Sequence, residues 1–244
     1  MKRFILNENI RRFRLYAAKD ISEEERSFVT MKLAELAREL ALIEAASTGA
    51  HMYASFSQPP PGVSDPDFLN MLDESPNLVM IIDPNPGLRV VYMNQAFADA
   101  TLVTREDAIG RELFELYPDN PEEVNADGIS NLYNSLRHAV ETRKPHHMAE
   151  QRYDVRDAQG NFVERYWTPI NSPVFDDDGK LVWILHEAVD VTERTLDRRR
   201  RRHRPLLPSA ARPPSTRADY LPLAILAASF SGTTSSRHDF SLPR

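Results

Sequence analysis

The stretch LVWILHEAVDVTE, residues 181–193, decides the fold of the central part of this chain. Residues 181–191 form an apolar run rich in β-branched side chains, which is typical of a buried strand. The run closes on Asp190-Val191-Thr192-Glu193, in which Asp190 and Thr192 are residue types that cap helices. The stretch therefore predicts a strand that passes directly into a helix.

Turn signals divide the sequence upstream of this strand into further short elements. Asp83-Pro84-Asn85-Pro86-Gly87 is a dense turn signal between two apolar runs, which indicates a hairpin. Asn94 and Thr104 precede short helical patterns and are suited to cap them. Phe68, Leu69 and Leu72 indicate a short lead-in helix that ends near Pro76. The expected strands are residues 78–82, 89–93, 147–156, 162–174 and 181–191, and the further expected helices are residues 95–101, 104–110, 113–117 and 127–142.

The order of these elements predicts an α+β fold. Two strands, a group of helices and three hairpin-linked strands favour a five-stranded antiparallel sheet with helices on one face. We expect this domain at residues 67–193, preceded by an N-terminal helical hairpin at 1–48 and a linker at 49–66. Residues 194–244 are expected to start a signalling helix and then continue as a disordered tail rich in Arg, Pro and Ser.

Several motifs resemble those of a PAS domain. They are Asn94-Gln95-Ala96-Phe97, Gly110 and the closing Asp190-Val191-Thr192-Glu193. Residues 114–121, 151–155 and 164–169 are similar to a PAS subgroup found in bacterial sensor histidine kinases of two-component systems. The resemblance implies a non-catalytic sensory module that holds a ligand or a partner and relays a change through its C-terminal helix. Asp190 and Thr192 are the candidate relay residues.

The first 48 residues predict two helices with one apolar seam each. Ser22 and Glu25 have the spacing of a capping box at the start of the second helix. The seam of that helix has coiled-coil spacing and consists of Val29, Leu33, Leu36, Leu40 and Ile43. Two interpretations stay open, because the seams of both helices can bury each other within one chain or form the interface of a homodimer.

Two segments have an uncertain origin in the sequence. Gly49-Ala50-His51-Met52 is typical of a cloning scar, although natural sequence can be the same, and prolines at 59–61 exclude helix and strand. The tail beyond residue 202 has no periodicity, and one hypothesis is a frameshifted gene that has lost its kinase module.

Composition excludes several kinds of chemistry. The sequence contains no cysteine, which excludes disulfides, thiolate metal sites and the cysteine adducts of flavin-based light sensors. A net charge of -6 gives no global reason to expect nucleic acid. No run approaches the roughly 20 apolar residues of a membrane helix, so we expect a cytoplasmic protein without a membrane partner.

Alternation along the strands places a few polar or aromatic side chains towards the helices. Ala149, Gln151, Tyr153 and Val155 share one face of the third strand. A few directional groups in an apolar surround are typical of small-molecule pockets, although hydrogen-bonded core residues have the same pattern. The candidate ligand-binding residues are Phe97, Gln151, Tyr153, Trp167, Asn171, Ile184 and His186.

No cofactor is required by these residues, and no catalytic or metal-binding group is expected. A haem- or flavin-binding redox or gas sensor is an alternative, but His138 lies opposite the apolar stripe of its helix and should face solvent. A second alternative is a transcription-associated regulator that contacts DNA through the arginine run 198–202. The preferred interpretation is a sensory module whose expected partners are a second copy of itself, a histidine kinase module and a small ligand.

Overall fold

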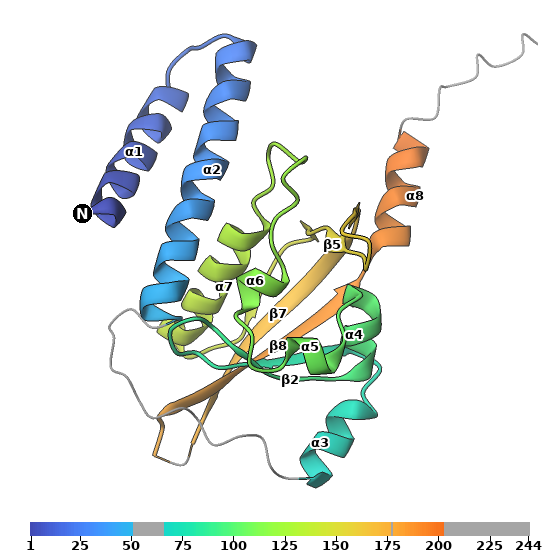
Figure 1. Ribbon diagram of the computed structural model, residues 1–244. Helices are drawn as coiled ribbons and strands as arrows, with labels where there is room; N and C mark the ends of the chain where they lie inside the picture. The colour runs from blue at the N-terminus through green and yellow to red at the C-terminus, as the bar shows by residue number, and fades with distance from the viewer. Residues whose placement is uncertain (51–65, 177, 203–244) are drawn as a thin grey trace, which may run out of the picture. The chain divides into compact units, whose positions relative to one another are not determined.

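Figure 1 shows the computed structural model, which describes residues 1–50, 66–176 and 178–202. Most of the expected linker, including the proline run, lies outside the described residues, as does the expected disordered tail from residue 203. Within the described ranges, no helix is both long enough and apolar enough to cross a bilayer.

An antiparallel sheet forms the centre of the fold. Its strands lie in the order β2-β1-β8-β7-β3, and β4 also pairs with β7. Strands β2 and β3 lie at opposite edges of this sheet, so the segment that connects them crosses one face of the sheet. The predicted α+β class is confirmed. The strands are β1 (Leu78–Ile82), β2 (Val90–Met93), β3 (His146–His147), β4 (Gln151–Arg152), β7 (Tyr166–Phe175) and β8 (Leu181–Asp190), with β5 (Val155–Arg156) and β6 (Phe162–Val163) in a separate ladder.

The third expected strand is interrupted by a bulge opposite a proline. His147 pairs with Ile170, and Gln151 pairs with Trp167. The segment from β3 to β4 therefore has one residue more between these two pairs than β7 has, which is a β-bulge. Pro169 lies in this interval and has no N–H to donate to the ladder, although its carbonyl accepts from the Met148 amide at 2.9 Å. The extra residue turns Met148 towards the helices and leaves Ala149 exposed. The expected placement of Ala149 on the inner face is therefore wrong.

Four helices cover the inner face of the sheet. They are α4 (Gln95–Thr101), α5 (Arg105–Ala108), α6 (Leu113–Leu116) and α7 (Gly128–Thr142). The Asn94 side chain accepts from the Phe97 amide, and the Thr104 side chain accepts from the Asp107 amide, which confirms both predicted caps. Met80, Leu113 and Leu136 are among the fully buried residues of the core between these helices and the sheet.

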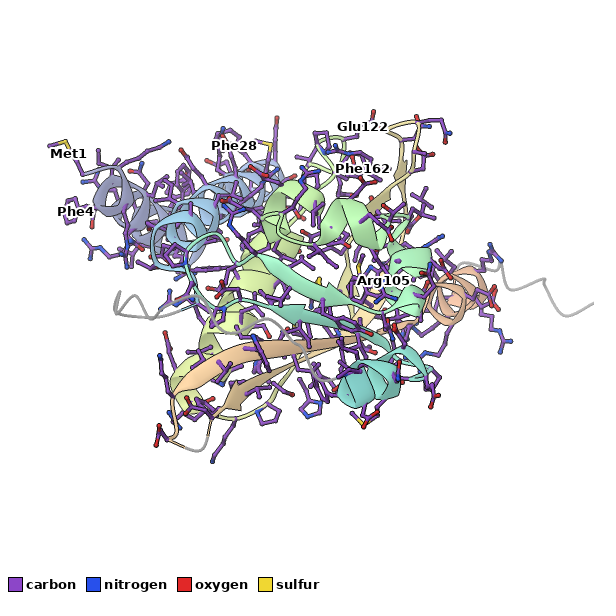
Figure 2. The ribbon with its side chains drawn as sticks, turned by 60° about the horizontal axis from the view of Figure 1, so that its bottom comes forward. Met1, Phe4, Phe28, Arg105, Glu122 and Phe162 are labelled. Carbon is purple, nitrogen blue, oxygen red and sulfur yellow. The ribbon has the colours of Figure 1, made fainter. Side chains whose placement is uncertain are left out.

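Part of the opposite face is covered by α3 (Pro66–Asp73), as Figure 2 shows. Leu72 of this helix packs with Val79, Ile81 and Tyr92, whose side chains alternate with the inward residues of β1 and β2. The side-chain Nδ2 of Asn94 donates to the carbonyl of Leu72 at 3.1 Å, which holds the end of α3 against the start of α4. The sheet therefore has helices on both faces at its β1–β2 end, in addition to the expected layer.

The N-terminal hairpin consists of α1 (Lys2–Ala17) and α2 (Glu23–Thr48), which lie side by side in Figure 1. The capping box of Ser22 and Glu25 is present as predicted. Val29 is only 2% exposed, and Leu6 and Ile10 of α1 are also buried. The other residues of the α2 seam are half-buried, namely Leu33, Leu36, Leu40 and Ile43. Within one chain, the two seams thus bury each other at least in part.

The last turns of α2 share the core of the sheet domain. Ala41 and Ala45 are buried in the same cluster as the residues of α7 and the sheet. Glu44 is 5% exposed and pairs with Arg3 of α1 at 2.8 Å and Arg137 of α7 at 3.1 Å. Gly49 has a φ of +62°, and a Cβ there would lie 2.2 Å from the carbonyl oxygen of Pro84. Glycine is therefore required at this position by the close approach of two backbones.

Candidate functional site

A small cavity lies between the inner face of the sheet and the helices that cover it. Its volume is about 60 Å³, and nearly all of its surface is apolar. Side chains from both layers line it, because β1, β7 and β8 lie on one side and α4, α6 and α7 on the other. The cavity therefore lies where a bound molecule contacts both the sheet and its helical cover.

Most of the predicted ligand-binding residues line this cavity. They are Phe97, Gln151, Tyr153, Trp167 and His186. Asn171 and Ile184 are fully buried but do not reach the cavity wall. Asn171 lies behind His186, to which it is hydrogen-bonded, and Ile184 pairs with Ile82 in the core. Strand alternation correctly placed both residues on the inner face of the sheet, but it did not reveal that they are buried behind the cavity wall.

Other lining residues were missed by the sequence analysis. Met148 reaches the cavity because of the bulge opposite Pro169, which alternation alone does not reveal. Met80 and Ala188 lie on predicted strands, where they alternate with outward residues, so strand alternation could have identified them. The remaining missed residues come from the helical layer and from β7: Thr101, Leu113, Tyr117, Gly128, Leu132 and Pro169.

Tyr153 is fixed tightly against the start of α7. Its hydroxyl donates to the carbonyl of Tyr117, and its own carbonyl accepts from the Trp167 indole N–H at 2.8 Å. A Cβ on Gly128 would lie 2.3 Å from the Tyr153 ring, so only glycine permits this contact. Burial raises the pKa of Tyr153 well above its usual value, and the phenol remains a neutral donor.

His186 is the most distinctive polar group of the cavity. It is 5% exposed, and its Nδ1 lies 2.7 Å from Oδ1 of Asn171. The ring of Phe97 packs against it with an edge contact at 5.7 Å between centroids. Burial lowers the pKa of His186 to about 4, because the charged imidazolium loses its hydration here. The imidazole is therefore neutral at physiological pH, and its Nε2 has no hydrogen-bond partner among the described residues.

The predicted relay residues join β8 and β7 to α8 (Thr192–Arg202). The hydroxyl of Thr192 accepts from the Tyr166 amide at 3.0 Å, and the Val191 amide donates to the Tyr166 carbonyl at 2.9 Å. The carboxylate of Asp190 accepts from the Thr192 amide at 2.8 Å. The strand β8 thus connects His186, in its middle, to Asp190 at its end, where the start of α8 is attached to β7.

A second set of contacts holds α8 further along its length. Arg198 pairs with Glu150 at 2.6 Å, and Glu150 belongs to the bulged segment between Met148 and Gln151. Arg199 donates to the hydroxyl of Tyr166 and lies over its ring at 4.5 Å. The helix therefore continues through the arginine run that the sequence analysis assigned to the tail, and it contacts a segment that also lines the cavity.

The other histidines of the described residues, His138, His146 and His147, lie near the other end of α7. His138 is exposed, as predicted from its position opposite the apolar stripe. The rings of His138 and His146 are 4.6 Å apart, and Nδ1 of His146 lies 2.7 Å from Oγ of Ser135. His146 is half-buried and His147 exposed, which agrees with their expected positions on opposite faces of a strand.

Comparison with known proteins gives a consistent set of similarities. The sequence profile described as the PAS fold matches residues 72–196. A blue-light-activated histidine kinase of Erythrobacter litoralis is 28% identical over 137 residues, which is 54% of this chain and 34% of the kinase. The chain therefore spans about a third of the length of that relative.

Two solved structures are similar at low sequence identity. The PAS domain of a protein from Colwellia psychrerythraea has 14% identity and a TM-score of 0.40, with 52% of this chain and 96% of that domain covered. A Rhodobacter sphaeroides LOV protein has 15% identity and a TM-score of 0.39, with coverage of 50% and 64%.

Proposed function

Because the chain belongs to the PAS fold family, we propose that it is a cytoplasmic, non-catalytic sensory module of a two-component signalling system. In this proposal the cavity binds a small, largely apolar molecule, and the change reaches α8 through β8 and β7. The observation that carries it is the position of His186, which lines the cavity four residues before Asp190 on the same strand. A displacement of His186 by a ligand acts directly on the strand that positions α8.

The chemistry of the cavity defines the class of ligand. Its surface is apolar, and Nε2 of His186 has no hydrogen-bond partner within the described part of the chain. Asn171 Oδ1 can only accept, so His186 carries its proton on Nδ1 and Nε2 is an acceptor. The best match is a compact molecule with one hydrogen-bond donor on an apolar body.

The size of the cavity favours a ligand smaller than a flavin or a haem. Sites for drug-sized molecules have volumes of roughly 300–1,000 Å³, whereas this cavity has about 60 Å³. The absence of cysteine also removes the residue on which a flavin adduct forms. These observations favour a small-molecule sensor over the photosensing that the name of the Erythrobacter relative suggests.

The signalling partners follow from the same proposal. A histidine kinase module is the expected partner of α8, since the Erythrobacter relative is a histidine kinase. We also propose that the α1–α2 hairpin supports a homodimer through the seam of α2. Sedimentation velocity of the Leu36→Ala, Leu40→Ala double variant tests this, and we expect a weaker dimer. A lower free energy of unfolding with unchanged sedimentation would assign the seam to packing within one chain.

DNA binding through the arginine run has less support. Arg198 and Arg199 pair with Glu150 and Glu164 of the sheet domain, and Arg200 pairs with Asp197 within α8. Three of the five adjacent guanidinium groups are therefore paired with carboxylates. Partial neutralisation by carboxylates reduces the charge that remains for phosphates.

A binding experiment tests the proposed ligand site. Pyrrole is a suitable probe, because it is a five-atom ring with a single N–H donor. We expect pyrrole to shift the ¹³C-methyl signals of Met80 and Met148, which line the cavity, but not that of the exposed Met71. Ala188→Leu fills the cavity and should abolish the shifts, whereas Val189→Leu on the outward side of β8 should preserve them. Binding that survives in Ala188→Leu would contradict the site, and native mass spectrometry of the purified protein would identify a natural ligand.

A further inference from the structure

A row of hydrogen bonds connects the cavity to the surface of the domain. His186 Nδ1 lies 2.7 Å from Asn171 Oδ1, and Asn171 Nδ2 lies 2.7 Å from Ser135 Oγ. Ser135 Oγ lies 2.7 Å from Nδ1 of His146, which is half-buried. These four residues, named here the His186–His146 relay, come from β8, β7, α7 and β3.

The interior members of the relay depend on one another for hydrogen bonds. Asn171 is 0% exposed and Ser135 2%, so neither has water to replace a lost partner. Apart from a weak contact between Asn171 Nδ2 and the Met148 sulfur, each group has one hydrogen-bond partner on either side. An amide, a hydroxyl and an imidazole can each donate on one side and accept on the other. The relay is therefore fully satisfied in only two arrangements, in which all donors point outward or all point inward.

The structure has the outward arrangement. Asn171 Nδ2 has a second, weaker contact with the Met148 sulfur at 3.6 Å, which favours this orientation of the amide. His186 then donates to Asn171, Asn171 donates to Ser135, and the Ser135 hydroxyl donates to His146. In this arrangement the Nδ1 of His146 is an acceptor and the Nε2 of His186 faces the cavity as an acceptor.

We propose that protonation of His146 reverses the relay, so that His186 presents a donor to the cavity instead of an acceptor. A protonated His146 donates from Nδ1 and can no longer accept from Ser135. Ser135 then donates to Asn171 Oδ1, the amide turns over, and Asn171 Nδ2 donates to Nδ1 of His186. The proton of His186 moves to Nε2 as a change of tautomer, and no charge enters the apolar cavity.

Only a few charged or titratable groups face His146 in the described part of the chain. His138 of α7 is in ring contact, and His147 follows on the same strand. The paired residues of β7 are Asn171 and Ile170, which carry no charge. Burial and the two histidine neighbours lower the pKa of His146, which agrees with the outward arrangement at neutral pH.

The inference rests on the proposed ligand site, but its first test requires no ligand. Long-range ¹H–¹⁵N NMR spectra of the full chain with ¹⁵N-labelled histidine report which ring nitrogen of His186 carries the proton. We expect a change from Nδ1–H to Nε2–H as the pH falls through the titration of His146, before direct protonation of His186 near pH 4. Ser135→Ala should abolish the change, and the control His147→Gln should retain it.

A second test measures the preference of the cavity with two rings of equal size. Pyrrole has an N–H donor, whereas furan has an oxygen acceptor and no donor. We expect the affinity for pyrrole relative to furan to fall by roughly threefold to tenfold as His146 becomes protonated, the range of one neutral hydrogen bond. A His186 that keeps one tautomer through the titration of His146, or that changes equally in Ser135→Ala, would overturn the relay. Absence of binding by both probes at every pH would instead refute the proposed ligand site.

Discussion

His186 shows how one residue combines a structural cost with a proposed function. A neutral imidazole in an apolar surround has lost the hydration that a charged form needs, and its hydrogen bond to Asn171 is retained inside the domain. Such a residue makes the stability of the domain depend on pH. The same burial provides the cavity with one oriented polar nitrogen.

The stability of the domain should therefore fall in mild acid. The pKa of His186 is lowered from 6.5 to about 4, so between these values the unfolded chain binds a proton that the folded chain does not. Stability consequently rises with pH across this window, and the part due to His186 amounts to about 3 kcal/mol. Urea denaturation between pH 4 and pH 7 should show this slope in the wild type.

Variants separate His186 from the other histidines. His186→Gln keeps a side-chain donor for Asn171 but cannot titrate, so its free energy of unfolding should depend much less on pH. His138→Gln changes an exposed side chain and should retain the wild-type slope. If the free energy of unfolding depended on pH equally in the wild type and in His186→Gln, the buried imidazole would not be the cause of the pH dependence.

At the residue scale, some parts of the site were predictable and others were not. Trp167 and His186 were found because β7 and β8 alternate regularly around them. Ser135 and His146 were missed as a connected pair, because only the packing of α7 against β3 brings them together. A serine within the apolar stripe of α7 was an available signal, since a polar residue there needs a buried partner.

The helix α8 is the element through which the proposed signal leaves the domain. Its first turn depends on Thr192, whose hydroxyl satisfies the Tyr166 amide of β7. Replacement by valine has the same shape but leaves that buried amide without an acceptor, which costs about 1–3 kcal/mol. In Thr192→Val, we expect hydrogen exchange of the α8 amides to be roughly ten times faster.

A matched substitution on β7 provides the control for this prediction. Thr168 lies on the same strand as Tyr166, is half-buried and pairs with Val189 on the outward face. Thr168→Val should leave exchange in α8 unchanged. Similar exchange in both variants would mean that the contact between Thr192 and Tyr166 does not hold the helix.

Elements with local signals were predicted from the sequence more reliably than elements set by distant contacts. The caps at Ser22, Asn94 and Thr104 were correct, because a cap depends on residues three positions apart. The broken third strand was not predicted, since its bulge is caused by Pro169, a residue on the neighbouring strand. The length of α8 was also missed, because its arginines are held by Glu150 and Tyr166 from the sheet.

At the scale of the whole molecule, a buried carboxylate contributes, together with the shared apolar core, to the contact between the hairpin and the sheet domain. Glu44 connects α1, α2 and α7 through Arg3 and Arg137, whereas Glu39 pairs only with the exposed Lys2. Glu44→Gln removes the carboxylate that Arg3 and Arg137 share, although Arg137 keeps its pair with Glu141 at 2.9 Å. We expect a loss of about 1–3 kcal/mol in the free energy of unfolding. Glu39→Gln should cost less than about 0.5 kcal/mol. Equal effects in urea denaturation would mean that Glu44 does not join these helices.

The central claim is that occupancy of the cavity changes the state of α8. The most direct test measures hydrogen exchange of the amides of residues 192–202 with and without saturating pyrrole, in the wild type and in Ala188→Leu. The account predicts a change in α8 protection in the wild type and no response in Ala188→Leu. Pyrrole that shifts the Met80 and Met148 methyl signals while α8 exchange stays constant would contradict it.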